Sequence, residues 1–397
     1  MLSKIKNITK YLYLKIIEVI SSLVKLFIRK INPRLLVFGG NNFTGNTKYL
    51  FLFMNNYLKN QYTIIWISGN KDLVNELKYQ GYNAKYKFSL KSVVLLLKAR
   101  CIFITHGFND ILPVNLDNNT KLVYLAHGIP FKRPNFDAKN FNTIFKSKYD
   151  IKMIEKLFKR MDYHISCADN FNKILANAYK MSEEKVKTTG YPRNDIFFVK
   201  DIEYISNLKN KFGIPFTKKI VLYAPTFREH RIIRFPLSSK EIRELDKFLE
   251  ESNSLLLVKP HINENIIEFN TINNAKVISQ EIDIQELLLI SDILITDYSS
   301  VFLDYILTDR PIIFYAYDLD YFRTTRGEFY YKYEDFIPGP LALKGKDLIN
   351  QLQIVFNYNS YSKKIKEIKD FSHQYQDGNS CKRVCELLGL HIDSEII

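Results

Sequence analysis

Short apolar runs alternate with longer stretches of helical periodicity along most of the chain. Runs that are apolar throughout are typical of strands buried on both faces of a parallel sheet, and the longer stretches are typical of helices that cover it. In the first half of the chain the pattern predicts strands at Leu35–Phe38, Thr63–Ile67, Cys101–Thr105, Leu122–Leu125 and Tyr163–Cys167, with helices at Asn46–Lys59 and Ser89–Lys98.

The second half repeats this plan after a polar stretch, residues 200–214, which leads into Pro215. We therefore expect an α/β protein with two doubly wound parallel-sheet domains, residues 34–205 and 206–397, that face each other across a cleft. This architecture is GT-B-like, and its ligands bind beyond the carboxyl ends of the strands. The predicted elements are strands at Lys219–Tyr223, Leu255–Val258, Lys276–Ser279, Ile293–Thr296 and Pro311–Tyr315, and helices at Lys240–Glu251 and Asp283–Ile290.

Residues 4–30 have a different pattern, in which polar and aliphatic positions each recur every three or four residues. This spacing predicts an amphipathic helix with a basic face within segment 1–33. Lys15 and Glu18 interrupt the apolar residues, so the helix is too short and too charged to span a bilayer. The helix either packs on the protein's own core or lies on an anionic membrane surface. Its seven basic residues against one acidic residue favour the membrane.

The net charge of +15 calls for an anionic partner, either nucleic acid, a membrane surface or a phosphate-rich substrate. Lysines are spread along the whole chain and no nucleic-acid recognition motif is present, so we expect no nucleic-acid partner. The four cysteines form no CxxC pair, which is typical of a protein from a reducing cytosol. Because no metal-ligand spacing, Walker loop or GxGxxG is found, we expect neither a metal ion nor a cofactor.

His127 is the first candidate for chemistry, because it follows a predicted strand and begins a turn with Gly128 and Pro130. An imidazole titrates near neutrality and can take a proton from a hydroxyl group. Lys132 and Arg133 come directly afterwards and would attract a phosphorylated ligand. The alternative is a structural His in a turn, and the adjacent basic pair favours a functional one. His106 ends another predicted strand and is a secondary candidate.

The second half places several phosphate-binding side chains at strand ends. Ser299 and Ser300 fall where a strand gives way to a helix predicted at Val301–Leu307, a position where backbone N–H groups and hydroxyls suit a phosphate. The alternative is that a serine merely caps the helix. Other predicted strand ends carry Thr226, Arg228, Lys259 and His261. Asp318-Leu-Asp320 has the form of a metal-binding Asp-x-Asp, but the pattern is short and common.

Taken together, these motifs resemble the CDP-glycerol glycerophosphotransferase family of wall teichoic acid synthesis. The resemblance covers roughly residues 122–340, and the motifs are specific jointly rather than singly. The residues that follow His127-Gly128, Ile129-Pro-Phe-Lys132, differ from the Thr-Pro-Leu-Lys that many members carry. The motifs are His127-Gly128, Thr189-Gly-Tyr-Pro-Arg-Asn-Asp195, Tyr223-Ala-Pro-Thr-Phe-Arg228, Thr296-Asp-Tyr-Ser-Ser300, Arg310-Pro-Ile-Ile-Phe-Tyr-Ala-Tyr-Asp-Leu-Asp320, Arg326-Gly327 and Pro338-Gly-Pro340.

The resemblance implies transfer of glycerol phosphate from CDP-glycerol to a hydroxyl of a lipid-linked or polymeric acceptor, with release of CMP, at the cytoplasmic face of the membrane. It implies His127 as the base and His261 as a group that holds or activates the donor phosphates. The acceptor-side candidates are Lys132 and Arg133, and the donor-side candidates are Thr226, Arg228, Lys259, Asp297, Ser299, Ser300 and Arg326.

Three alternatives stay open. The same family includes transferases of ribitol phosphate from CDP-ribitol. A GT-B glycosyltransferase that uses a sugar nucleotide for a capsule or surface glycan would have the same fold. A non-catalytic binder of lipid or RNA would be driven by charge alone, and its binding would be salt-sensitive and independent of His127 and His261.

Overall fold

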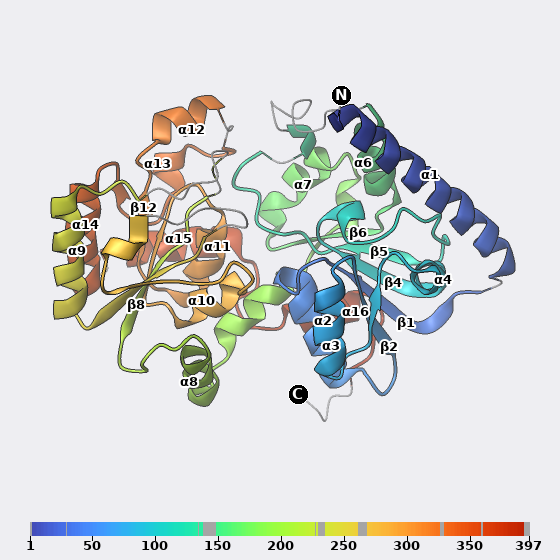
Figure 1. The fold of residues 1–397 in the computed structure, drawn as a ribbon, viewed down its shortest axis with the longest axis horizontal. Coiled ribbons are helices and arrows are strands. Elements are labelled where there is room, and N and C mark those ends of the chain that lie inside the picture. Colours follow the sequence, from blue (N-terminus) through green and yellow to red (C-terminus); the bar gives the residue numbers. More distant parts are fainter. Residues whose placement is uncertain are drawn as a thin grey trace. The chain divides into compact units, whose positions relative to one another are not determined.

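The computed structural model describes residues 2–28, 30–133, 135–137, 148–226, 228, 235–260, 268–325, 329–358 and 360–392. The chain forms two compact units. Unit 1 comprises Met1–His127, Phe145–Arg193 and Asn379–Ile397, and unit 2 comprises Gly128–Ile144 and Asn194–Gly378. Both units are α/β (Figure 1).

The described part of unit 1 contains a seven-stranded parallel sheet in the order β3-β2-β1-β4-β5-β6-β7. The order reverses between β1 and β4, where the chain changes its direction of winding. Open α/β sheets bind ligands at this kind of switch point. The strands are β1 (Asn32–Gly39), β2 (Thr63–Ser68), β3 (Ala84–Tyr86), β4 (Ala99–Ile104), β5 (Lys121–Tyr124), β6 (Tyr163–Ser166) and β7 (Val186–Thr188).

Helices cover this sheet, and an aromatic cluster fills one side of it. Phe38 of β1 stacks on Phe103 at 4.4 Å between ring centroids and meets Phe51 edge-on at 5.4 Å, while Trp66 packs against Phe51 at 5.3 Å. All four side chains are buried. The α-helices are α1 (Leu2–Phe27), α2 (Gly45–Tyr57), α3 (Lys71–Tyr79), α4 (Leu90–Lys98), α6 (Lys148–Arg160), α7 (Asn172–Ala178) and α16 (Ser380–Leu387).

Unit 2 has a parallel sheet in the order β10-β9-β8-β11-β12-β13, and its order reverses between β8 and β11. Its strands are β8 (Lys219–Tyr223), β9 (Ser254–Val258), β10 (Ala275–Val277), β11 (Ile293–Thr296), β12 (Ile312–Tyr315) and β13 (Leu341–Ala342). Its α-helices are α8 (Ile202–Lys211), α9 (Ser239–Glu251), α10 (Ile284–Ile290), α11 (Val301–Tyr305), α12 (Leu319–Thr325), α13 (Tyr333–Phe336), α14 (Gly345–Asn357) and α15 (Ser362–Ser372).

The predicted α/β class with two parallel sheets is confirmed, since each predicted strand overlaps an observed one. Local sequence explains several helix starts. Ser238 and Glu241 form a capping box at α9, and the Asp283 side chain accepts from the backbone N–H of Gln285 at the start of α10. The strands that the sequence pattern missed are β3, β7 and β13, which have only two or three residues each.

Helix α1 lies along unit 1 beside α4 (Figure 1). Ile17 and Ser21 are buried, Ser21 Oγ accepts from the Asn115 N–H at 3.4 Å, and Lys25 Nζ donates to Leu116 O at 3.1 Å. Another side of the same helix leaves apolar side chains in solvent, since Leu26 is 77% and Phe27 is 86% exposed. No helix within the described ranges has the length and apolarity to cross a bilayer.

Candidate functional site

His127 lies three residues beyond the carboxyl end of β5 in unit 1, where the residue reaches the surface while its ring is crowded by the surrounding protein. The backbone of Thr105 lies beside the ring, and its hydrogen bond with the ring favours the protonated form. His106 stacks on His127 with 5.4 Å between ring centroids.

The turn after β4 is held by Asp110, a residue that sequence reasoning did not single out. Its buried carboxylate Oδ2 accepts from the N–H of Thr105 at 2.7 Å and from the N–H of His106 at 2.6 Å. These bonds fix both residues that contact the His127 ring. Asp110 therefore supports His127 through the backbone of its neighbours.

The pKa of His127 is lowered to about 4. Loss of hydration where protein atoms crowd the ring is the largest cause, and the charges of His106 and Arg193 add to it. The hydrogen bond to Thr105 and the charge of Asp110 oppose the shift. The imidazole is consequently neutral at pH 7 and can accept a proton from a hydroxyl group.

The backbone next to His127 is strained. Ala126 has φ 56°, in the left-handed region, which costs a residue other than glycine about 1–2 kcal/mol. The fully buried Asn46 amide donates to Leu125 O at 2.7 Å and to Ala126 O at 2.9 Å. Arg193 donates from Nη1 to His127 O at 2.7 Å. The carbonyl groups of three consecutive residues are thus fixed by two side chains.

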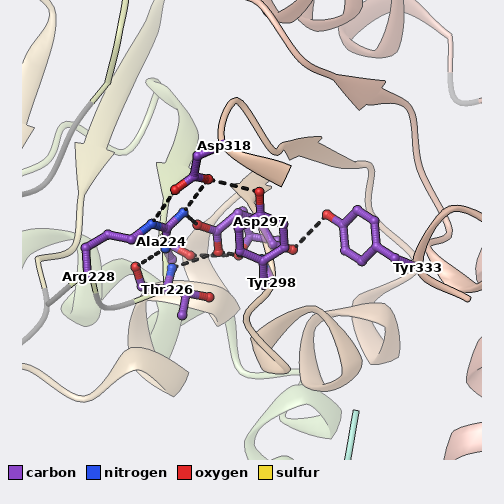
Figure 2. Close-up of polar contacts among 8 residues, drawn as sticks. Ala224, Thr226, Arg228, Asp297, Tyr298, Asp318 and Tyr333 are labelled. Atoms are coloured by element: carbon purple, nitrogen blue, oxygen red, sulfur yellow. Dashed lines mark hydrogen bonds and ion pairs between the residues drawn. The ribbon is translucent and has the colours of Figure 1, made fainter. Parts of the chain in front are cut away.

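In unit 2, a polar network joins the carboxyl ends of β8 and β11, at the switch point of the sheet (Figure 2). Asp297 Oδ1 accepts from the N–H of Thr226 at 2.7 Å and from the N–H of Tyr298 at 2.6 Å. Tyr333 donates from its hydroxyl to Asp297 O at 3.1 Å. Asp297 is 1% exposed, so this turn is held from several sides.

Arg228 is the centre of this network (Figure 2). It donates to Asp297 Oδ2 at 2.8 Å, to both carboxylate oxygens of Asp318 at 2.9 and 3.0 Å, and to Thr226 O at 2.6 Å. Tyr298 also donates to Asp318, at 2.9 Å. Burial opposes the charged guanidinium, but Asp297 and Asp318 together outweigh it and raise the pKa of Arg228. One guanidinium between two carboxylates leaves the cluster with a net charge of −1.

The predicted phosphate-binding hydroxyls lie beside this network. Ser299 Oγ accepts from the Val301 N–H at 3.3 Å, which is the capping alternative, whereas Ser300 makes no cap bond with its side chain. Helix α11 has only five residues and continues as the short 3₁₀ helix Ile306–Thr308. The Thr226 hydroxyl is buried and has no hydrogen-bond partner among the described residues.

Lys259 follows β9 and is half-buried. Its Nζ donates to Ser279 O at 3.1 Å and to Gln280 O at 2.7 Å. Burial lowers the pKa of Lys259 to about 8, and the charge of Asp283 opposes this shift. At pH 7 the amine is still mostly protonated, and an anion near Nζ would raise its pKa again, because opposite charges stabilise each other.

The comparisons with known proteins decide the family. The sequence model described as CDP-Glycerol:Poly(glycerophosphate) glycerophosphotransferase matches residues 22–390. The chain belongs to this family. The resemblance noted from the sequence motifs is therefore confirmed, and so is the expected class of enzyme, a glycerophosphotransferase.

Relatives and solved structures agree with this assignment. A teichoic acid glycerol-phosphate transferase of Staphylococcus aureus is 32% identical over 88% of this chain and 91% of its own length. A teichoic acid poly(ribitol-phosphate) polymerase of Bacillus spizizenii is 29% identical over 91% of this chain and 60% of its own length. The solved wall teichoic acid polymerase TagF matches with a TM-score of 0.81 at 27% identity, over 98% of this chain and 97% of that chain. A variant of it soaked with CDPG has the same TM-score. These matches confirm the predicted GT-B-like fold.

Several predicted site residues of this glycerophosphotransferase belong neither to the group of residues around His127 nor to the polar network around Arg228. His261 and Arg326 lie outside the described residues, so their roles stay predictions. Lys132 and Arg133 follow His127 in sequence but belong to unit 2. Lys132 Nζ lies 5.7 Å from the centroid of the Phe322 ring, and the Arg133 guanidinium lies 5.5 Å from that of the Tyr330 ring.

Asp318 was a weak metal candidate in the sequence and is instead bonded to Arg228 and Tyr298. Within the part of the chain that the structure describes, no three His, Cys, Asp or Glu side chains gather as a metal site would require. Sequence reasoning missed Asn46, Asp110 and Tyr333. For Arg193 a signal existed, since it lies in the Thr189–Asp195 motif, but that motif carried no assigned role.

Proposed function

We propose that the chain transfers glycerol phosphate from CDP-glycerol to a hydroxyl group of a lipid-linked or polymeric acceptor, with release of CMP, in the synthesis of teichoic acid or a related surface polymer. Family membership supports the donor and the reaction class. The observation that carries the mechanism is the position of His127 beyond β5, where its ring stacks on His106 and the surrounding protein lowers its pKa, so that the imidazole is neutral and can accept a proton.

The reaction is one in-line displacement at the β-phosphorus of CDP-glycerol. The acceptor oxygen forms a bond to this phosphorus while the bond to the bridging oxygen breaks. His127 takes the hydroxyl proton, and the bridging oxygen leaves with CMP. Reactions of this type depend on positioning and on neutralising phosphate charge, so side-chain cations and N–H donors can stabilise the transition state.

The donor phosphates are held in unit 2 in this proposal. Thr226, Ser299 and Ser300 supply hydroxyl donors, and Lys259 supplies a positive charge. The described bonds of Arg228 go to Asp297, Asp318 and Thr226, which supports a role in orienting the turn that carries the two serines. His261 and Arg326 remain predicted donor-side groups.

Lys132 and Arg133 are proposed to face the acceptor. An acceptor built of phosphodiester units is anionic, and long basic side chains that pack on aromatic rings keep their charge available at the surface. The net charge of +15 would attract both the nucleotide donor and such an acceptor.

We also propose that α1 lies on an anionic membrane surface, with the protein peripheral at the cytoplasmic face. The exposed apolar side chains of α1 support this proposal, because Leu23, Leu26 and Phe27 would be buried in the interface.

Release of CMP tests the proposal. The protein is incubated with CDP-glycerol or CDP-ribitol, each with and without a lipid-linked acceptor, and CMP is followed by chromatography. We expect acceptor-dependent release from CDP-glycerol and a loss of about 10²–10⁴-fold in His127→Ala. Near-full turnover in that variant would refute the role of His127. Preference for CDP-ribitol would favour the second candidate, which the 29% identity to a ribitol-phosphate polymerase supports.

A further inference from the structure

The two side chains that fix the backbone at His127 come from distant parts of unit 1. Asn46 is in the first turn of α2, and Arg193 is in the Thr189–Asp195 motif. They are joined to each other, because the Arg193 backbone N–H donates to Asn46 Oδ1 at 3.1 Å. Each end of the buried Asn46 carboxamide is thereby bonded: the amide to Leu125 O and Ala126 O, and the oxygen to Arg193.

We propose that Asn46 and Arg193 are positioning residues that hold the left-handed backbone of Ala126 and so aim the His127 imidazole at its reaction partner. This inference rests on the proposed role of His127 as the base. It gives a function to Arg193, the basic residue of a motif that the reaction chemistry had not used.

The strain at Ala126 explains why this backbone needs a clamp, which Asn46 and Arg193 form. A non-glycine residue leaves the left-handed region when nothing holds it there, because its Cβ is crowded by the backbone. Rotation of this peptide would carry the next residue, His127, away from Thr105. Left-handed residues other than glycine recur at functional sites, where the surrounding structure over-determines them.

Burial shields the hydrogen bonds of this clamp and restricts the orientation of its two side chains. Asn46 is fully buried and Arg193 is 8% exposed, so water does not compete easily for these hydrogen bonds. The Arg193 guanidinium packs 5.5 Å from the centroid of the Tyr191 ring, which restricts its rotation. A buried carboxamide with bonded donors and acceptor has one permitted orientation.

Steady-state CMP release from CDP-glycerol tests this inference. Asn46→Ala is expected to lower kcat by about ten-fold or more with little change in KM for CDP-glycerol, because the proposed donor-binding groups are in unit 2. Adding Ala126→Gly should recover most of the lost kcat, since glycine occupies the left-handed region without a clamp. Unchanged kcat in Asn46→Ala would overturn the inference.

Two matched controls separate positioning from general stability. Asn55→Ala removes a carboxamide of the same helix α2 that donates only to Phe51 O in the described hydrogen bonds, and it should leave kcat unchanged. Lys180 is another left-handed residue of unit 1, with φ 49°. Lys180→Gly added to Asn46→Ala should not restore kcat. Equal recovery from Gly at either position would overturn the inference.

A spectroscopic measurement separates failure of this inference from failure of the proposed function. Nitrogen-15 NMR of the histidine rings reports the tautomer of His127, whose signals are identified by their loss in His127→Gln. We expect one neutral tautomer in the parent protein, a mixture in Asn46→Ala, and the single tautomer again after Ala126→Gly is added. If His127→Ala keeps its turnover, the base assignment fails. The tautomer measurement still tests whether Asn46 and Arg193 position the His127 ring. An unchanged tautomer in Asn46→Ala overturns the clamp whether or not His127 is the base.

Discussion

Arg228 and Asp318 form a two-pronged ion pair in unit 2, with Nε 2.9 Å from Oδ2 and Nη2 3.0 Å from Oδ1. The side chain of Arg228 is 12% exposed and that of Asp318 is 18% exposed. The planar fork of arginine matches a carboxylate in a way that lysine cannot. The pair ties the Asp318–Asp320 segment to the turn that carries Ser299 and Ser300, because Arg228 also binds Asp297.

Removing the guanidinium should therefore destabilise unit 2. Arg228→Ala leaves the carboxylates of Asp297 and Asp318 without their counter-charge, and breaking a buried ion pair in this way costs about 3–5 kcal/mol. Urea unfolding monitored by far-ultraviolet circular dichroism measures the decrease in the free energy of unfolding. Arg243→Ala, at an exposed position of α9 in the same unit, is the control and should stay within about 0.5 kcal/mol of the parent protein. Equal stabilities for the two variants would contradict this account.

The lowered pKa of His127 predicts the pH dependence of turnover. Only the neutral imidazole accepts a proton, so kcat/KM should stay level as pH falls to about 5 and reach half its plateau near the folded pKa of about 4. The charge of His106 helps to lower that pKa. His106→Gln should accordingly move the acid limb to higher pH. A limb near 6.5 in the parent protein, or no movement in the variant, would rule this explanation out.

Buried His164 predicts a pH dependence of stability. It packs between Tyr124 and Tyr179, and burial lowers its pKa to about 3. Between about pH 3 and 6.5 the unfolded chain binds a proton at this residue that the folded protein does not bind. The free energy of unfolding should therefore fall as pH falls through that window. In His164→Phe the loss between pH 7 and 4.5 should be smaller, as measured by urea unfolding at each pH. A loss as large as that of the parent protein would show that other groups cause it.

The exposed apolar side of α1 predicts membrane binding. Leu23→Asp combined with Phe27→Asp should reduce cosedimentation with anionic phosphatidylglycerol vesicles by about ten-fold or more, since each large apolar side chain contributes about 1.5–3 kcal/mol on burial. Ile202→Asp, at a 71% exposed position of α8 in unit 2, is the matched control. Binding that survives the double substitution but disappears in high salt would assign the interaction to basic side chains alone.

Much of the fold followed from sequence pattern because parallel strands are continuous apolar runs. Leu36, Trp66 and Leu222 lie in runs of this kind and are fully buried. The pattern did not reveal β13, since two residues carry no periodicity. It also gave no sign that Arg100 donates to Leu388 O and Gly389 O, because such backbone contacts depend on tertiary position rather than on residue type.

The candidate site was predictable where residue type carries the chemistry. An imidazole and a pair of hydroxyls at strand ends can be identified without coordinates, as His127, Ser299 and Ser300 were. Asn46 could not be identified in this way, because a single asparagine at a helix start is ordinarily a local cap. The engagement of Arg228 by two carboxylates was equally hidden, since Asp297 and Asp318 lie 69 and 90 residues away in sequence.

The assignment of α16 to unit 1 affects how the protein can be divided. Residues 379–397 join a unit whose other segments end at Arg193, so no single cleavage of the polypeptide yields both halves whole. A fragment that stops at Arg193 would lack α16 with its buried Cys381 and Cys385, and would deprive Arg100 of the carbonyl oxygens of Leu388 and Gly389. Separate production of the histidine-bearing half therefore requires that its last helix be reattached by a designed linker.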